Sequence, residues 1–250
     1  MIGIRGICRA VDERTIIATI LPYVVAGNSI PICYCNNKNA MFLTSIISSF
    51  VFDFFARFKM GGTNLNFFII EQLATLSSES LSSSMNCLGG ATPIDYLRPR
   101  VLELTYTTWD MKDFAEDLGF SGNPFAWNEE RRFLIRAELD ALFFHLYFPS
   151  ESDGSWKRAK GETDTEIQGL KESFASPREA INHIMDSFWI RKERDEKAFG
   201  SYRTKEEILR VYDTMQECMR TGKAYESPLY GEDGKPLPLP ATQQEEAHAR

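Results

Sequence analysis

The sequence lacks the residue patterns of most enzymes, because histidine is scarce and phosphate-binding glycine motifs are missing. Only His145, His183 and His248 occur among its 250 residues. The first two lie within apolar helical patterns and the third lies near the C-terminal end, so no signature pairs any of them with a serine or cysteine nucleophile. Neither the Walker pattern nor the dinucleotide glycine fingerprint is present. We therefore predict no catalytic residue in this chain.

Long apolar runs are missing as well. No uninterrupted stretch reaches the roughly 18 apolar residues that a membrane-spanning helix needs. The N-terminus lacks the basic, apolar and small-residue order of a secretory signal. We therefore expect a soluble cytoplasmic protein with no membrane partner.

Cysteine is sparse, and its spacing does not favour a metal site. The five cysteines are an odd number scattered along a chain too long to need a disulfide framework, so we expect reduced thiols. Cys33 and Cys35 could share one face of a strand, but no second cysteine or histidine pair lies nearby, which favours packing over zinc. The acidic pair Asp12 and Glu13 is more typical of a charged turn than of a nuclease metal site. We predict no metal ligands.

The acidic balance is unevenly distributed. The net charge is -7, yet residues 1 to 75 carry six basic against four acidic side chains, whereas the remainder carries 22 basic against 31 acidic ones. Phosphate neutralisation by Lys and Arg dominates nucleic-acid binding, so only the first part of the chain fits such a partner. An acidic, solvated helical surface explains the rest.

The first part of the chain has mixed periodicity. Residues 15–21 and 30–35 are rich in strand-forming side chains, with turn chemistry at Gly27-Asn28-Ser29 between them. Apolar residues spaced by three and four predict one helix over 39–58, which we expect Gly61 and Gly62 to end. The following segment, 66–73, is strand-like at its start, and its end could be helical.

The later part of the chain is predominantly helical. Residues 77–90 are rich in Ser and Gly and predict a linker. Helical patterns follow over residues 93–109, 111–118, from Asn128 onwards, from Ser176 onwards and over 204–221. The fold class is therefore α+β. We predict a small mixed α/β domain over 1–76, a linker over 77–90, a helical domain over 91–225 with a flexible insertion at 150–173, and a flexible tail over 226–250.

An ordered set of motifs adds a resemblance to a known family. The chain resembles the C-terminal target-recognition region of large adenine-specific DNA methyltransferases of restriction-modification and phage-defence systems, of the type IIG or DISARM-like kind. The order of strand, helix, Gly-rich turn and strand in the first part is also similar to half of a type I restriction specificity subunit. The stretches that carry the resemblance are residues 9–22, 27–29, 52–59, 61–69, 97–106, 130–140 and 202–205.

The resemblance implies a module that reads double-stranded DNA while a separate domain methylates adenine N6. In the family the catalytic and S-adenosylmethionine-binding motifs lie upstream, so we expect no cofactor in this chain and no methyl transfer by it alone. A separate methyltransferase catalytic subunit is then an expected partner. The alternative is a structural subunit that docks such a partner through its helical half without contacting DNA.

The residue types around the Gly-Gly turn suit contact with DNA. Two glycines let the backbone approach phosphate, a threonine hydroxyl can donate to phosphate oxygens, and asparagine can pair with adenine. The alternative is an ordinary helix end leading into a strand. The predicted DNA-binding residues are Arg9, Arg14, Asn28, Arg57, Lys59, Gly61, Gly62, Thr63, Asn64 and Asn66.

Overall fold

A computed structural model describes the chain except residues 160, 232 and 239–250. It confirms the α+β class, since a small antiparallel sheet accompanies a mainly helical body. The sheet has the order β2-β1-β3 and consists of β1 (Ile2–Ile4), β2 (Ala18–Ile20) and β3 (Ile32–Cys33). Ile2 lies opposite Ile20 on one side and Cys33 on the other. The two predicted strands therefore exist but are shorter than expected.

The prediction of one long helix over residues 39–58 is wrong, because the structure has two helices there. α1 (Asn37–Ile47) and α2 (Phe50–Lys59) meet at an angle of 71°. The Ser49 hydroxyl accepts a hydrogen bond from the Phe52 N–H and donates to the Ile46 carbonyl, so it caps one helix and closes the other. Apolar periodicity continues across the break, which hides the bend from a pattern search.

The segment after α2 also differs from the sequence prediction. The helix ends at Lys59 with Met60 in an extended conformation, and neither Gly61 nor Gly62 has a positive φ. Residues 67–70 form the short helix α3 (Phe67–Ile70) instead of a strand. Leu65 and Ile69 are buried, so this segment is held to the core by single apolar side chains.

The expected linker at 77–90 contains α4 (Ser78–Ser82) and the 3-10 turn η1 (Asn86–Leu88). Leu81 and Cys87 are buried in the hydrophobic core, which explains why this Ser-rich segment is ordered against the helices. The remaining helices are α5 (Pro93–Thr105), η2 (Trp109–Met111), α6 (Lys112–Asp117), α7 (Glu129–Tyr147), α8 (Asp164–Ser173), α9 (Pro177–Asp186), α10 (Trp189–Phe199) and α11 (Arg203–Thr221).

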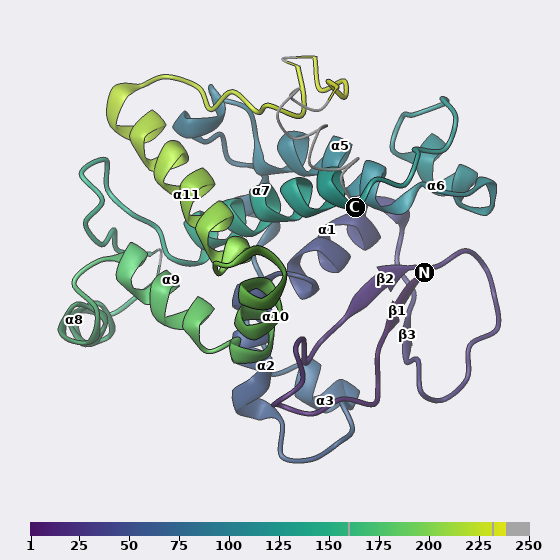
Figure 1. Ribbon diagram of the computed structural model, residues 1–250, viewed down its shortest axis with the longest axis horizontal. Coiled ribbons are helices and arrows are strands. Elements are labelled where there is room, and N and C mark those ends of the chain that lie inside the picture. The colour runs from purple at the N-terminus through teal and green to yellow at the C-terminus, as the bar shows by residue number, and fades with distance from the viewer. Residues whose placement is uncertain (160, 232, 239–250) are drawn as a thin grey trace.

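The helices pack around α7, which is the most buried long element of the chain. α5, α11 and α2 contact α7 directly, and α1 lies between the sheet and α5 (Figure 1). One hydrophobic core cluster includes Ile2 from the sheet, Phe52 from α2, Phe143 from α7 and Met215 from α11. Residues of the predicted domains 1–76 and 91–225 therefore share one hydrophobic core.

The two segments predicted to be flexible are described in part. Residues 150–173 contain an isolated bridge between Ser150 and Trp156 and the helix α8, which buries no side chain. In the predicted tail, Leu229 and Tyr230 are buried, while residues 232 and 239–250 lie outside the described residues. No single helix in the described chain is long and apolar enough to cross a membrane, although the bent pair α1 and α2 together has that length and composition.

Candidate functional site

Two of the predicted DNA-binding arginines are used inside the protein. Asp53 is completely buried on α2, and its carboxylate accepts hydrogen bonds from Arg14 Nε at 2.5 Å and from the Thr15 N–H at 3.0 Å. Arg57 donates to the backbone carbonyls of Asp12 and Glu13, at 2.8 and 3.0 Å. Arg14 and Arg57 therefore hold the loop over residues 9–15 against α2.

The other predicted residues are exposed. Arg9 is exposed and pairs with Asp12. Gly6 donates a hydrogen bond to the Ser29 carbonyl and accepts one from the Leu65 N–H. The loop that contains Asn28 and the turn from Lys59 to Asn66 therefore lie on opposite sides of the chain at Gly6. The exposed members of the predicted set next to these two segments are Asn28, Lys59, Gly61, Gly62, Thr63, Asn64 and Asn66.

The Lys59-to-Asn66 turn offers polar groups without internal partners. Within the described chain, no hydrogen bond engages the side chains of Lys59, Thr63, Asn64 or Asn66, although the Thr63 carbonyl accepts from the Cys8 N–H at 3.1 Å. A Cβ atom added at Gly61 or Gly62 would meet nothing within 4 Å. The glycines are therefore not required by the fold, and the turn is free to contact another molecule.

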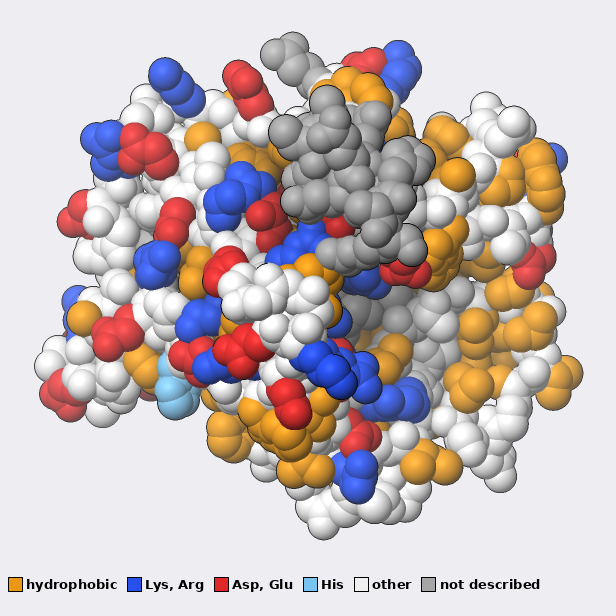
Figure 2. Space-filling view, in the orientation of Figure 1, with side chains coloured by type: hydrophobic (Ala, Val, Ile, Leu, Met, Phe, Trp, Pro, Cys, Tyr) orange, Lys and Arg blue, Asp and Glu red, His pale blue; other side chains and the backbone are white. Residues whose placement is uncertain are grey.

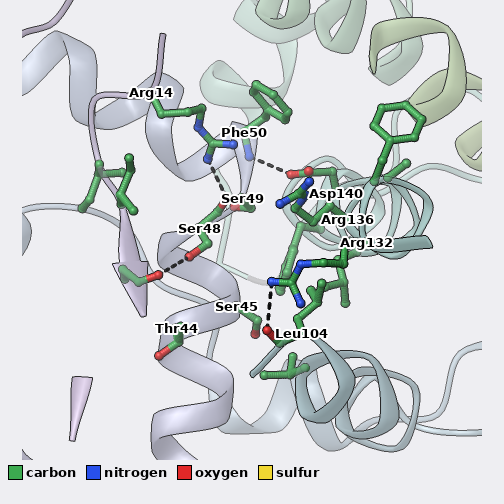
Figure 3. A pocket seen from close by; sticks show the side chains of 18 of the residues that line it. Arg14, Thr44, Ser45, Ser48, Ser49, Phe50, Leu104, Arg132, Arg136 and Asp140 are labelled. Carbon is green, nitrogen blue, oxygen red and sulfur yellow. Dashed lines mark hydrogen bonds between the residues drawn. The ribbon is translucent and has the colours of Figure 1, made fainter. Parts of the chain in front are cut away.

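A cavity of about 390 Å³ lies elsewhere, between the first part of the chain and the helical body. Its walls come from β2 and the segment before it, from the junction of α1 and α2, and from α5, α7, α10 and α11. Figure 3 shows Arg14 and the serines of the α1–α2 junction on one side and Arg132, Arg136 and Asp140 of α7 on the other. Lys and Arg side chains also gather near the middle of the molecular face in Figure 2.

The charged wall of the cavity is a stripe on α7. Arg132, Arg136 and Asp140 are spaced by four residues, so they lie on one face of that helix, which otherwise contributes mainly apolar side chains to the core. Like charges at this spacing repel each other, at a cost of about 0.2–0.5 kcal/mol per pair in exposed helices. In the sequence this stretch stands out through the resemblance, and the four-residue spacing of Arg132, Arg136 and Asp140 is the signal from which a charged helix face could be predicted.

Arg136 is the least compensated charge of the stripe. In the described part of the chain it forms no hydrogen bond or ion pair, although Asp140 lies one turn away. Its side chain is exposed at the mouth of the cavity, yet neighbouring protein atoms displace part of the guanidinium's hydration, and this desolvation lowers its pKa. Attraction to Glu129 and Asp140 opposes that change, whereas repulsion from Arg191 and Arg14 adds to it. The site is therefore one in which a bound anion would be favoured.

Arg132 lies beside Arg136 and also has no carboxylate partner among the described residues. Its Nη2 donates to the Leu104 carbonyl at 3.0 Å, and its guanidinium lies 3.7 Å from the centre of the Trp127 ring. Its Nε is buried without a hydrogen-bond partner in the described chain. Desolvation and the charge of Arg136 lower the pKa of Arg132. A second polar atom without such a partner, Thr44 Oγ1, lies in the same cavity wall.

The remaining two arginines of the cavity are compensated. Arg14 pairs with Asp53 and donates to the Ser48 carbonyl at 2.5 Å. Arg191 pairs with Asp195 at 3.1 Å and with Glu13 at 3.2 Å. These two residues place positive charge at the cavity wall, but their hydrogen bonds are directed into the protein.

Asp140 belongs to the cavity but serves the fold. Its Oδ1 accepts a hydrogen bond of 2.7 Å from the Phe50 N–H, so the carboxylate occupies the N-terminus of α2. Burial raises the pKa of Asp140 to about 6, and Arg14 and the Phe50 N–H oppose that rise. The N-terminus of α2 is therefore already occupied, and Arg136 and Arg132 are the groups left for a ligand.

No group of residues that could hold a metal ion occurs in the described chain. Cys33 and Cys35 are half-buried free thiols on and beside β3. The described residues that line the cavity include no histidine or cysteine. Its donors are guanidinium groups and hydroxyls, which suit binding.

Comparison with known proteins gives no relative: no family model, no curated protein and no solved structure matches this chain. The residues themselves therefore carry the functional argument.

Proposed function

We propose that this protein is a cytoplasmic binding protein that holds an anionic small molecule in the arginine-lined cavity. The observation that carries this proposal is Arg136, a guanidinium with no ion pair or hydrogen bond in the described chain, held next to Arg132 inside a concave site. Volumes of roughly 300–1,000 Å³ are typical of small-molecule sites, and this cavity falls within that range.

The arrangement favours an anion for an electrostatic reason. Arg132 and Arg136 repel each other across one helical turn, and both have lost hydration, which lowers the pKa of each. A carboxylate, sulfate or phosphate between them replaces the missing hydration and cancels the repulsion. Charge-assisted and bidentate hydrogen bonds from guanidinium groups make such contacts both strong and specific.

The test is a titration with sulfate followed by calorimetry, with chloride at equal ionic strength as the reference. We expect saturable sulfate binding by the wild-type protein and at least about a tenfold loss of affinity in Arg136→Gln, which removes one charge-assisted contact of about 1.5–3 kcal/mol. The matched control is Arg220→Gln, since Arg220 pairs with Glu217 on the exposed side of α11. Equal sulfate affinity in Arg136→Gln and the wild type would contradict the proposal.

Arg136→Gln should not unfold the protein. The substitution removes a repelling charge that has no partner in the described chain, so we expect a free energy of unfolding equal to or above that of the wild type. Urea unfolding without sulfate checks this. A destabilised variant would mean that Arg136 serves the fold instead.

A second candidate function is contact with double-stranded DNA through the Lys59-to-Asn66 turn. The observation that favours it is the set of exposed side chains there that make no internal hydrogen bond, with Asn64 directly opposite Ile7. In this proposal the chain supplies target recognition to a separate methyltransferase subunit that carries S-adenosylmethionine. The alternative remains a subunit that docks such a partner without contacting DNA.

DNA binding is tested by electrophoretic mobility shift with duplex DNA. Because Arg14 and Arg57 are used internally and Arg9 pairs with Asp12, Lys59 is the one basic residue of the predicted set that has no ion pair among the described residues. We therefore expect weak binding that is lost between about 50 and 200 mM salt. Lys59→Ala should weaken the shift for every sequence, whereas Asn64→Ala should alter sequence preference. Unchanged DNA migration at low salt, with folded protein, would exclude this function.

A further inference from the structure

The cavity has two neighbouring guanidinium groups and an apolar wall, and each of these features limits the kind of ligand that it can bind. This inference rests on the proposed function, because it names the class of anion that the same site accepts.

Two guanidiniums of the cavity make no hydrogen bond or salt bridge to a carboxylate within the described part of the molecule. Arg14 and Arg191 have such partners, whereas Arg132 and Arg136 feel Glu129 only through longer-range attraction, to which Asp140 adds at Arg136 and Glu103 at Arg132. A single dianionic group would neutralise both guanidiniums. A carboxylate or a phosphate diester carries one negative charge and would match only one of the two guanidiniums.

The two guanidiniums also come from adjacent turns of one helix. Residues four apart on a helix have Cβ atoms about 5–6 Å apart, so both forks can reach one compact group. A terminal phosphate offers three oxygens around one phosphorus, and two arginines can each engage a different edge of it. A dicarboxylate instead separates its two charges along a carbon chain, which fits such closely spaced donors less well.

The rest of the cavity wall is apolar. Phe133 precedes Arg136 by one turn on α7, and Leu104 faces the cavity from α5. Other apolar side chains reach the cavity from β2 and its approach, from α5, from α7 and from α11, among them Ile17, Ala18, Val101, Phe143 and Ile208. A ligand that fills the space therefore needs an apolar body beside its charged group.

We infer that the ligand is a phosphate monoester with a compact apolar or aromatic body, whose phosphate lies between Arg132 and Arg136 and whose body packs against Ile17, Leu104 and Phe133. The phosphate supplies the two negative charges, and the body displaces water from the apolar wall. Ile17 is partly exposed at the cavity, which makes it the residue of this wall that can be changed without disturbing the core.

The experiment compares four anions by calorimetry at about pH 8, where phosphate monoesters are dianions because their second pKa is about 6. The probes are phenyl phosphate, inorganic phosphate, phenylacetate and succinate. We expect phenyl phosphate to bind at least about tenfold more tightly than each of the others, which corresponds to about 1.4 kcal/mol. Arg132→Gln should weaken both phosphates by more than it weakens phenylacetate.

The apolar wall is tested with Ile17→Ser. This variant should reduce the affinity for phenyl phosphate while leaving that for inorganic phosphate unchanged, which a general loss of folding cannot produce. Phenylacetate or succinate binding as tightly as phenyl phosphate would overturn the inference and leave the proposed anion site intact. If none of the four anions and no sulfate binds, the proposed function fails together with the inference.

Discussion

Single buried residues decide which charges of this protein face inward. Asp53 has no solvent exposure, and it collects hydrogen bonds or ion pairs from Arg14, Thr15 and Arg57. Both arginines were predicted to contact DNA because they lie in the stretches that carry the resemblance. Their shared partner is Asp53, which lies four residues before Arg57 on the same face of α2. The 71° bend between α1 and α2 determines that this face points into the protein.

His145 is a residue whose burial has a measurable consequence. Its ring stacks on Tyr212 with 3.9 Å between the ring centres, its Nε2 lies 3.1 Å from the Tyr212 carbonyl, and burial lowers its pKa to about 4. An unfolded histidine has a pKa of about 6.5, so the unfolded chain takes up a proton first as the pH falls. The stability that the folded protein gains from neutral, buried His145 is fully present above pH 6.5 and is lost as the pH falls from 6.5 towards 4.

We therefore predict that lowering the pH from 7.5 to 5 reduces the free energy of unfolding of the wild-type protein by about 2 kcal/mol through His145. His145→Phe keeps a flat ring against Tyr212 but cannot titrate. In urea unfolding, we expect the variant to have a lower free energy of unfolding than the wild type at pH 7.5. The difference between the two proteins should shrink by about 2 kcal/mol at pH 5. A constant gap would show that His145 is not buried in its neutral form.

At the scale of elements, the capping residues were predicted better than the breaks between helices. Asn128 and Ser176 begin helices as the sequence predicts, since cap preferences are local. The junction at Ser48 and Ser49 escaped prediction because apolar spacing continues through it. The same junction places the first N–H of α2 against Asp140 and so builds one wall of the cavity.

Ser49→Ala tests the importance of that junction. The hydroxyl is buried and makes two hydrogen bonds, so we expect a loss of about 1–2 kcal/mol in the free energy of unfolding. Ser77→Ala removes an equivalent cap from the exposed, five-residue helix α4, and we expect less than about 0.5 kcal/mol there. Denaturant unfolding of both variants makes the comparison. Equal losses would indicate that the bend is maintained by packing alone.

At the scale of the whole molecule, sequence analysis predicts the fold class but not the cavity. Composition and periodicity are properties of single segments, and they predicted the small sheet and helical body. The cavity draws its wall from residues as far apart as Glu13 and Ile208, and no local pattern reports such a meeting. Arg132 and Arg136 could be noticed in the sequence, but only the structure shows that neither makes a hydrogen bond or salt bridge to a carboxylate among the described residues.

The contacts of Glu13 with Arg191 and Arg194 have a consequence for synthesis. Residue 13 leaves the ribosome long before its partners, which follow 178 and 181 residues later. At about 5–20 residues per second, that interval is roughly 10–40 s. During this time the loop over residues 9–15 can reach Asp53 but not α10, and the cavity walls that α10 and α11 supply are added last. The cavity is therefore completed only after most of the chain has been translated.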